Sequence, residues 1–216
     1  TLISLLIYSS IFSQNDAEID NTFNSQSGFT RVVLNIAIQN DNKILVAGKN
    51  NISSTGGKLV RLNTDGSLDT SFSTEGFTNG YPNIIDGNIN TTLIQQDGKI
   101  LVGGNFNNFN GNSARQIIRL NQNGTTDNSF NGSFIGNNEK VYSFAIDSNN
   151  KILVGGSFNT YRTTTSKNLI RLNNDGTIDR TFNIDGYSNN TKVTSITIQE
   201  DNKILIGGSF TSYDGV

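Results

Sequence analysis

The chain of 216 residues contains no cysteine, histidine, methionine or tryptophan. Without cysteine it can form no disulfide, no thiol nucleophile and no cysteine-ligated zinc site. Without histidine it lacks the commonest general base and metal ligand, so neither a Ser-His-Asp nor a Cys-His catalytic site can be built within it. Chemistry based on carboxylates, lysine or tyrosine stays open.

Charge is also sparse, because charged residues make up 16% of the chain and the formal net charge is -2. Lysine and arginine form no basic block, so the sequence indicates no nucleic-acid partner. Hydrophobic residues reach 34%, which together with the regular pattern below is typical of one folded domain rather than of a disordered tail.

A long hydrophobic run occurs only at the start, where residues 1–14 read TLISLLIYSSIFSQ. The run is shorter than the roughly 20 residues that a membrane-spanning helix needs, and it matches the hydrophobic region of a secretory signal peptide. We therefore expect a signal-peptide remnant, an exported protein outside the cell or on a bacterial cell surface, and no stable membrane span in the mature chain. The alternative for this stretch is a buried first strand.

The rest of the chain, residues 15–216, repeats one unit of about 52 residues. Two independent motifs recur at intervals of 52 to 58 residues. The first is KIL[VI][AG]G and the second is RLNxxGxxDx[ST]F. A period near 50 that contains several short strands is the signature of a propeller blade. The first motif begins at residues 43, 99, 151 and 203, and the second spans residues 61–72, 119–130 and 171–182.

Each unit reads as four short strands, a to d, because Val, Ile, Leu, Thr and Phe dominate its runs and no 3.6-residue apolar period occurs. Strands a and b are joined by pairs such as Asp41-Asn42, the signal of a two-residue type I′ hairpin. The expected fold class is all-β, a β-propeller built of four-stranded antiparallel blades. In the last units, strands c, d, a and b correspond to residues 168–173, 177–183, 193–199 and 203–210.

The second motif joins strands c and d, and its Asn, Asp and Gly residues also suggest a calcium loop. An EF-hand loop needs an acidic or amide ligand at its first position and a glutamate at its twelfth. With Gly176 at the sixth position these places hold Arg171 and Phe182, so we expect no calcium and no other cofactor or metal. The motif instead predicts a type I turn with a G1 bulge, whose glycine takes a positive φ. The turn glycines are Gly66, Gly124 and Gly176.

The predicted turn pairs Leu172 with Ile178 and Arg171 with Asp179 across the hairpin. Opposite charges directly across a ladder contribute roughly 0.2–1 kcal/mol. Alternation along strand d predicts that the phenylalanine of the motif lies on the face opposite the ion pair, in the core between blades. The expected pairs are Arg61–Asp69, Arg119–Asp127 and Arg171–Asp179, and the expected core residues are Phe23, Phe72, Phe130 and Phe182.

These motifs, in this order, resemble the delta-60 repeat family, a tandem β-propeller-type repeat found mostly in exported bacterial proteins. The resemblance covers about residues 19–215 and implies a propeller fold. It implies little about activity, because the family has no established catalytic residues. The first unit departs from the pattern, with Ala47-Gly48-Lys49 where later units have two glycines, then Asn or Ser, then Phe.

The units divide the chain into a lone strand d at residues 18–24, three complete blades and a partial blade. Three blades are too few for a typical ring of about four to eight. We therefore expect an open arc of three to four blades cut from a larger ring, with further repeats and a C-terminal domain in the full-length protein; the alternative is a closed ring of four units. We expect residues 18–24 to complete the last blade. The blades span residues 31–73, 86–131, 140–183 and 192–216.

Function is expected on one face, because the long d–a and b–c connections emerge on the same side of a blade and vary between units, whereas the a–b and c–d turns are uniform. We expect a non-catalytic scaffold that uses this face for adhesion or for binding an unknown protein or carbohydrate ligand. The alternatives are a hydrolase or lyase using carboxylates near the central channel, such as Asp86 and Glu139, and a purely structural array. The candidate contacts are Tyr81, Asp86, Phe109, Tyr161 and Arg162.

Overall fold

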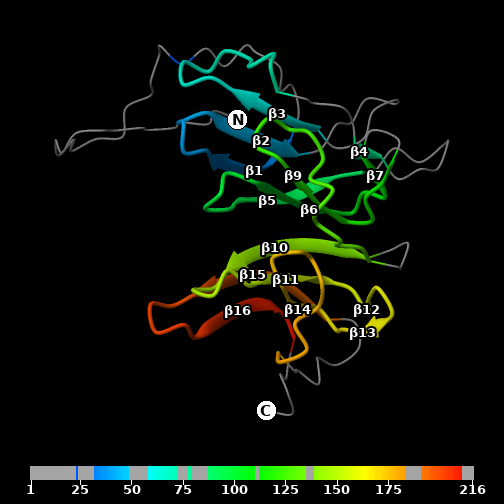
Figure 1. Cartoon of the computed structure of the whole chain (residues 1–216). Coiled ribbons are helices and arrows are strands. Elements are labelled where there is room, and N and C mark those ends of the chain that lie inside the picture. Colours follow the sequence, from blue (N-terminus) through cyan, green and yellow to red (C-terminus); the bar gives the residue numbers. More distant parts are fainter. Residues whose placement is uncertain are drawn as a thin grey trace.

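The computed structural model describes most of the repeat region, and the regular structure in it is entirely β-strand (Figure 1). Within this described part, no helix is long and apolar enough to cross a membrane. The expected signal segment, Tyr81 and Asp86 lie outside it. The described residues are 23, 32–48, 58–72, 77–78, 87–109, 112–134, 139–182 and 191–210.

Four antiparallel sheets carry the four predicted units, and strand b is the middle strand of the first three, between strands a and c. The strands a, b and c are β1 (Val33–Ile38), β2 (Ile44–Gly48) and β3 (Lys58–Leu62); β5 (Ile89–Ile94), β6 (Ile100–Gly104) and β9 (Ile117–Leu120); and β10 (Lys140–Ile146), β11 (Ile152–Ser157) and β14 (Leu169–Leu172). The fourth sheet pairs β15 (Lys192–Ile198) with β16 (Ile204–Ser209). Short strands lie between them: β4 (Phe77–Thr78), β7 (Asn108–Phe109), β8 (Asn112–Ser113), β12 (Thr160–Tyr161) and β13 (Thr164–Thr165).

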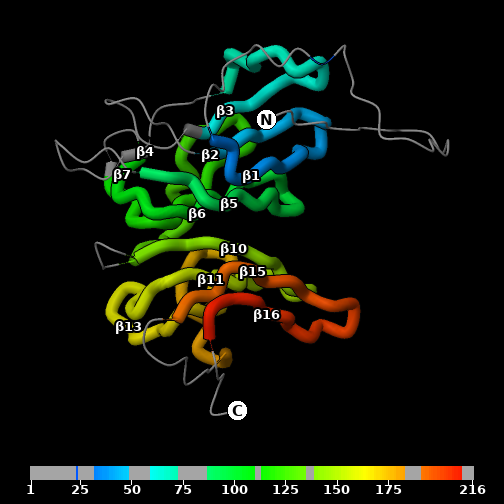
Figure 2. The backbone as a smooth tube through the Cα atoms, turned by 180° about the vertical axis from the view of Figure 1, so that it is seen from behind, coloured from blue at the N-terminus to red at the C-terminus, as the bar shows by residue number. Residues whose placement is uncertain are grey.

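The four sheets form an open arc. Their a strands contact one another in the order β1, β5, β10 and β15. The first sheet lies at one end of the molecule and the fourth at the other (Figures 1 and 2). The predicted all-β fold and the open arc are therefore confirmed. Phe23 packs against the first sheet, in a cluster with Ile44 and Val60. The other residues of the segment 18–24 lie outside the described part, so their expected place in the last blade stays a prediction.

The core lies between successive sheets, where burial of each aliphatic side chain contributes about 1.5–3 kcal/mol. Leu45 shares a buried cluster with Ile89 of the second sheet, and Leu101 shares one with Val141 of the third. The glycine pair of the first motif permits this close approach, because a Cβ on Gly103 would lie 2.5 Å from Val141 Cγ1. The predicted core residues Phe72, Phe130 and Phe182 pack into the clusters after the first, second and third sheets.

The c–d turn has the predicted register. Leu172 forms a bridge with Ile178, and the Asp179 amide donates to the Arg171 carbonyl at 2.9 Å. The turn glycines have φ values of 82° at Gly66, 89° at Gly124 and 82° at Gly176, as the G1 bulge requires.

Strand d, in contrast, does not form a ladder in the described blades, so their sheets have three strands and not four. After the single bridge the chain turns, and the Phe182 amide donates to the Asp179 carbonyl at 3.2 Å. Asp179 Oδ1 accepts from the Thr181 amide at 3.0 Å and from its hydroxyl at 2.7 Å, a local bond that competes with an extended strand. Since the strand alternation is lost, Phe182 lies on the same side as Arg171, whose Cζ is 4.7 Å from the ring centroid.

The a–b turns also differ from the prediction. The Gln39 amide donates to the Lys43 carbonyl and the Asn42 amide to the Gln39 carbonyl, each at 2.8 Å. Asn42 has a positive φ of 62° and Asp41 does not, whereas a type I′ turn needs both. The loop is thus a type I turn with a G1 bulge, the same turn as between strands c and d. The equivalent positive-φ residues are Gly98, Asn150 and Asn202.

The inner strands add polar links between blades. Each a strand has a β-bulge, and in the first three blades a polar side chain in or beside the bulge reaches the next sheet: Asn35, Asn90 and Ser143. Asn35 Oδ1 accepts from the Thr92 amide at 3.0 Å, and Ser143 Oγ accepts from the Ile196 amide at 3.1 Å. The bulge therefore aims one side chain per blade at its neighbour.

Candidate functional site

The molecule has two different faces. The a–b turns lie on one side, and the b–c hairpins β7–β8 and β12–β13 lie on the other (Figure 1). The c–d turns accompany the a–b turns, since Gln95 Nε2 after β5 donates to Asn174 Oδ1 in the next c–d turn at 3.1 Å. The uniform turns thus share one face, and the b–c connections lie on the opposite face.

Two of the predicted ligand contacts are wrong, because Phe109 and Tyr161 are buried, with 2% and 0% exposure. Their rings belong to the core between blades. Tyr161 packs edge-on against Phe134 with centroids 4.9 Å apart, and its hydroxyl donates to the Gly176 carbonyl at 2.5 Å. Neither side chain can meet a ligand at the surface.

Arg162 remains available at this face. It is half-buried, with a positive φ of 52°, and its Nη1 donates to the Asn131 carbonyl at 2.9 Å. Tyr81 and Asp86 lie outside the described residues.

A second repeated pattern explains the buried aromatics. Phe106 and Phe158 are 52 residues apart, as are Phe109 and Tyr161, so each b–c hairpin carries the spacing F-x-x-[FY]. The segment that follows one unit pairs with the hairpin of the next: Phe77 with Phe109 in β4 and β7, and Phe134 with Tyr161. These loops therefore have a structural part that repeats, and sequence reasoning missed it although the spacing was visible.

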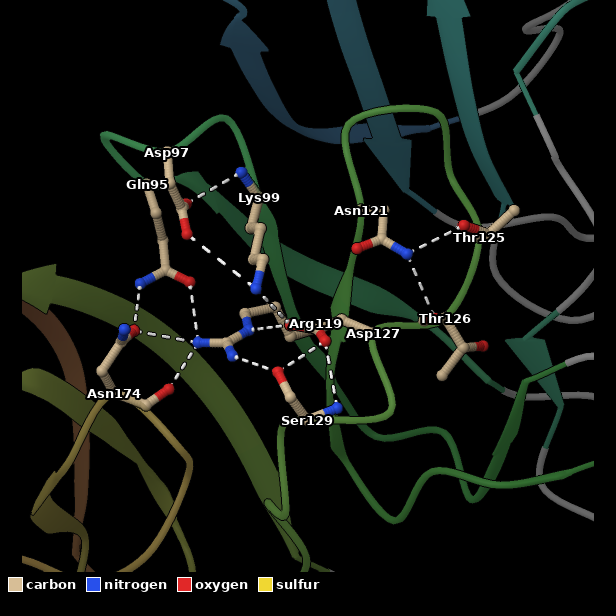
Figure 3. A network of polar contacts seen from close by, with 10 residues as sticks. All are labelled: Gln95, Asp97, Lys99, Arg119, Asn121, Thr125, Thr126, Asp127, Ser129 and Asn174. Carbon is tan, nitrogen blue, oxygen red and sulfur yellow. Dashed lines mark hydrogen bonds and ion pairs between the residues drawn. The ribbon is translucent and has the colours of Figure 1, made fainter.

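A polar network centred on the arginine of the second motif links the blades on the turn face. In the second blade (Figure 3), Arg119 Nε donates to Asp127 Oδ2 at 2.6 Å and Nη2 to Ser129 Oγ at 3.2 Å. Arg119 Nη1 donates to the backbone oxygen of Asn174, which belongs to the next blade. Lys99 Nζ adds an ion pair to Asp127 at 3.0 Å. One buried guanidinium thus joins two blades.

The network repeats in the first blade. Arg61 Nε donates to Asp69 at 2.7 Å, and Arg61 Nη1 donates to the Gln122 carbonyl of the second blade at 2.6 Å. Each guanidinium also stacks on the phenylalanine of its motif, with Cζ 4.7–4.8 Å from the ring centroid. The three predicted pairs are confirmed by ion pairs of 2.7 Å for Arg61–Asp69, 2.6 Å for Arg119–Asp127 and 2.9 Å for Arg171–Asp179.

These contacts hold the motif carboxylates in their charged form. Burial acts to raise the pKa of Asp127, but donation from Ser129 and Lys99 outweighs it and holds the pKa well below its usual range. For Asp179 the Thr181 hydroxyl is the largest cause, and the pKa falls to about 2. A general acid near neutral pH needs a raised pKa, so this chemistry favours a structural role for the motif.

Glu139 is a buried carboxylate of a different kind. Burial raises its pKa, and a hydrogen bond from the Asn159 amide to its Oε2, at 3.0 Å, opposes the shift. That bond ties the start of β10 to the b–c hairpin of the same blade. Within the described part of the chain, no group of three or more acidic side chains could hold a metal ion.

Comparison with known proteins supports the architecture. The model of a family described as a domain of unknown function, DUF5122 beta-propeller, matches residues 39–72, 95–130, 148–182 and 199–216. These segments follow the predicted units, so the propeller repeat is confirmed, while the name delta-60 stays a prediction. No curated protein matches the sequence.

A solved structure with a similar fold is the extracellular domain of the proposed one-component system BT4673 from B. thetaiotaomicron. The TM-score is 0.54 and the sequence identity 18%, over 86% of this chain and 21% of that one. The chain thus spans about a fifth of the protein it resembles, and the likeness is one of fold.

Proposed function

The chain belongs to the DUF5122 β-propeller family, and from this membership we propose that it is an exported, non-catalytic scaffold that binds a protein or glycan through its variable face. The observation that carries the proposal is that the two faces differ: one presents the repeated turns, and the other presents connections that vary between units. The charged groups of the second motif form an ion pair within the blade in all three units, and in the first two units the arginine also contacts the next blade, as expected for residues that maintain the fold.

The connections on the other face differ between units, and loops on a rigid scaffold are where binding residues concentrate. From Asp69 to Lys99 the chain runs 30 residues, against 24 in each of the next two units. The extra length falls in a segment that contains Tyr81 and Asp86. Arg162 is presented by a hairpin that Tyr161 anchors in the core. Aromatic and arginine side chains carry much of the energy of interfaces, so these residues form the proposed contact set.

Two observations support an extracellular location. Residues 1–14 have the hydrophobic character of a signal peptide, and the solved domain with a similar fold is extracellular. The absence of cysteine is compatible with any redox compartment.

A glycan array and a panel of purified surface proteins would test the proposal with the full chain. We expect saturable binding to at least one ligand, weakened about fivefold or more by Tyr81→Ala and by Arg162→Ala, as for interface residues whose truncation costs over 1 kcal/mol. Glu200→Ala, an exposed residue of the opposite face, is the matched control and should bind like the wild type. If no ligand binds, or if only the Glu200 variant is impaired, the variable face is not a binding surface.

A further inference from the structure

Two groups of cations in the described part of the chain have different surroundings. Seven lysines and arginines lie in or beside the a–b and c–d turns, and each forms an ion pair with an aspartate. A second group lies in the b–c connections and at the starts of β10 and β15, and no ion pair among the described residues involves it. This second group consists of Arg115, Lys140, Arg162, Lys167 and Lys192.

The acidic residues do not balance the second group. Apart from Glu139, every acidic residue in the described part lies in or beside a turn, and Glu139 is buried and bound to a backbone amide. Asp175 is linked to Asn131 next to Arg162, but only through its backbone carbonyl, because its carboxylate accepts from Thr177. The b–c connections therefore carry positive charge that the described fold leaves unpaired, and such a surface attracts anions.

One peptide group holds Arg115 and Arg162 near each other. The Phe134 amide donates to the Arg115 carbonyl at 3.2 Å, and the Arg162 amide donates to the Ser133 carbonyl at 3.1 Å. The Ser133 carbonyl and the Phe134 amide belong to the same trans peptide group and point in opposite directions. Since paired strands lie about 4.8 Å apart, the two arginine backbones are about 10 Å apart, one on each side of this segment.

Both arginines have a backbone conformation that disfavours arginine. The φ values are 38° at Arg115 and 52° at Arg162, in the left-handed region where residues other than glycine are uncommon. Tight hairpin turns prefer Asn-Gly, and the preceding unit has Asn110-Gly111 where this hairpin has Arg162-Thr163. Residues held in such conformations cluster at functional sites. The arginines therefore serve the surface rather than the turns.

The neighbouring groups favour a polysaccharide over a protein as the ligand. Ser113 and Thr163, beside the two arginines, are exposed and carry hydroxyl groups, whereas the rings of Phe109 and Tyr161 are buried. Protein interfaces are anchored by aromatic and apolar side chains at their centre. No described residue of these two hairpins exposes a large apolar side chain.

We propose that Arg115 and Arg162 form a binding site for the carboxylate or sulfate groups of an acidic polysaccharide. A guanidinium matches the geometry of an oxyanion, and Arg162 uses one of its five N–H donors on the Asn131 carbonyl, which leaves the others for a ligand. Lys140 and Lys167 add attraction at longer range. The inference rests on the proposed function, because it names the class of ligand that the variable face binds.

Polygalacturonate and its methyl ester are matched probes, because they share a sugar chain and differ in charge; dextran sulfate and dextran form the corresponding sulfate pair. We expect the full chain to bind at least one acidic probe in calorimetric titration and neither neutral one. Binding should weaken about tenfold between about 0.05 and 0.5 M salt. Arg115→Asn and Arg162→Asn should each weaken it about tenfold, as for the loss of a charged donor. Both should keep the melting temperature, because asparagine tolerates the left-handed backbone.

Lys203→Gln removes one positive charge from the turn face and should bind like the wild type. The inference is overturned if neither acidic probe binds, if the neutral probes or poly-L-glutamate bind as tightly, or if Lys203→Gln is impaired as much as the arginine variants. It is also overturned if binding is lost only together with a lower melting temperature. An uncharged glycan or a protein that binds the variable face would leave the proposed function standing without this inference, whereas binding to no ligand removes both.

Discussion

At the scale of single residues, the arginine of the second motif does more than pair with the aspartate across the turn. Arg119 satisfies Asp127 in its own blade and a backbone carbonyl in the next blade, and it lies over Phe130. A buried ion pair is a weak source of net stability, but the removal of one partner leaves a charge that nothing compensates. The cost of a substitution should therefore follow the burial of the arginine.

Asp127→Asn tests this dependence. We expect it to lower the free energy of unfolding by about 3 kcal/mol, because Arg119 is almost fully buried. Asp179→Asn is the matched variant and should cost about 1 kcal/mol, since Arg171 is partly solvated. Urea denaturation measures both, and equal costs at the two positions would contradict the argument.

The same carboxylates predict how stability depends on pH. The folded-state pKa of Asp179 is about 2, below the ordinary value of 3.8 for an unfolded chain. Between these values the unfolded state binds more protons, so the stabilisation is complete above about pH 4 and is lost as the pH falls towards 2. Thermal unfolding across this range should show a steep fall in melting temperature for the wild type and a shallower one for Asp179→Asn. If the melting temperatures of the two proteins fell in parallel with pH, protonation of Asp179 would not be the cause of the loss of stability.

At the scale of elements, local patterns predicted the c–d turn well. Its glycine, its register and its ion pair follow from neighbouring residues, because a turn of this kind is fixed by backbone sterics. The a–b turns were misassigned because Asp41-Asn42 fits both a two-residue and a three-residue loop, and only the φ of Asp41 separates them.

The end of strand d and the burial of the loop aromatics were not predicted, for two different reasons. Asp179 offers its carboxylate to Thr181 and ends the strand, although the run of residues has good strand propensity. Phe109 and Tyr161 resemble exposed loop residues until the segment from the preceding unit covers them. A local side-chain hydrogen bond thus ended strand d, whereas long-range contacts buried the two aromatic rings.

A glycine substitution tests the turn. Gly176→Ala places a Cβ at a φ of 82° and 2.8 Å from the Gly132 amide nitrogen, so we expect a loss of about 3 kcal/mol in unfolding free energy. Gly98→Ala is the control, with a similar φ of 80° but its nearest atom, on the flexible side chain of Gln122, at 3.4 Å; it should lose about 1 kcal/mol. Chemical denaturation compares the two, and a Gly98 variant as unstable as the Gly176 variant would contradict the steric explanation.

At the scale of the whole molecule, the described sheets contact one another in succession along the arc. Stability in such an array is approximately a sum of terms for each unit and each interface, so it should vary along the chain. The middle blades have a neighbour on both sides, whereas the fourth lies at one end.

Native-state hydrogen exchange should reveal this gradient. We expect the amides of β11 to exchange at least about tenfold more slowly than those of β16, because β11 is buried and paired on both edges. Mass spectrometry of peptic fragments, under conditions in which opening is rapid, resolves the two strands. Uniform protection of β11 and β16 would show that the arc unfolds as one cooperative unit.

The joint between blades, meaning the bond from the motif arginine to the next c–d turn, has a consequence for how such a chain can change in evolution. Arg61 and Arg119 bind the next unit through a main-chain oxygen, which belongs to glutamine in one turn and to asparagine in the other. Because every residue type carries that oxygen, this contact needs no compensating substitution when a unit is duplicated, deleted or shuffled. The joint therefore sets no limit of its own on the number of units, while the arginine itself cannot be replaced without loosening two blades at once.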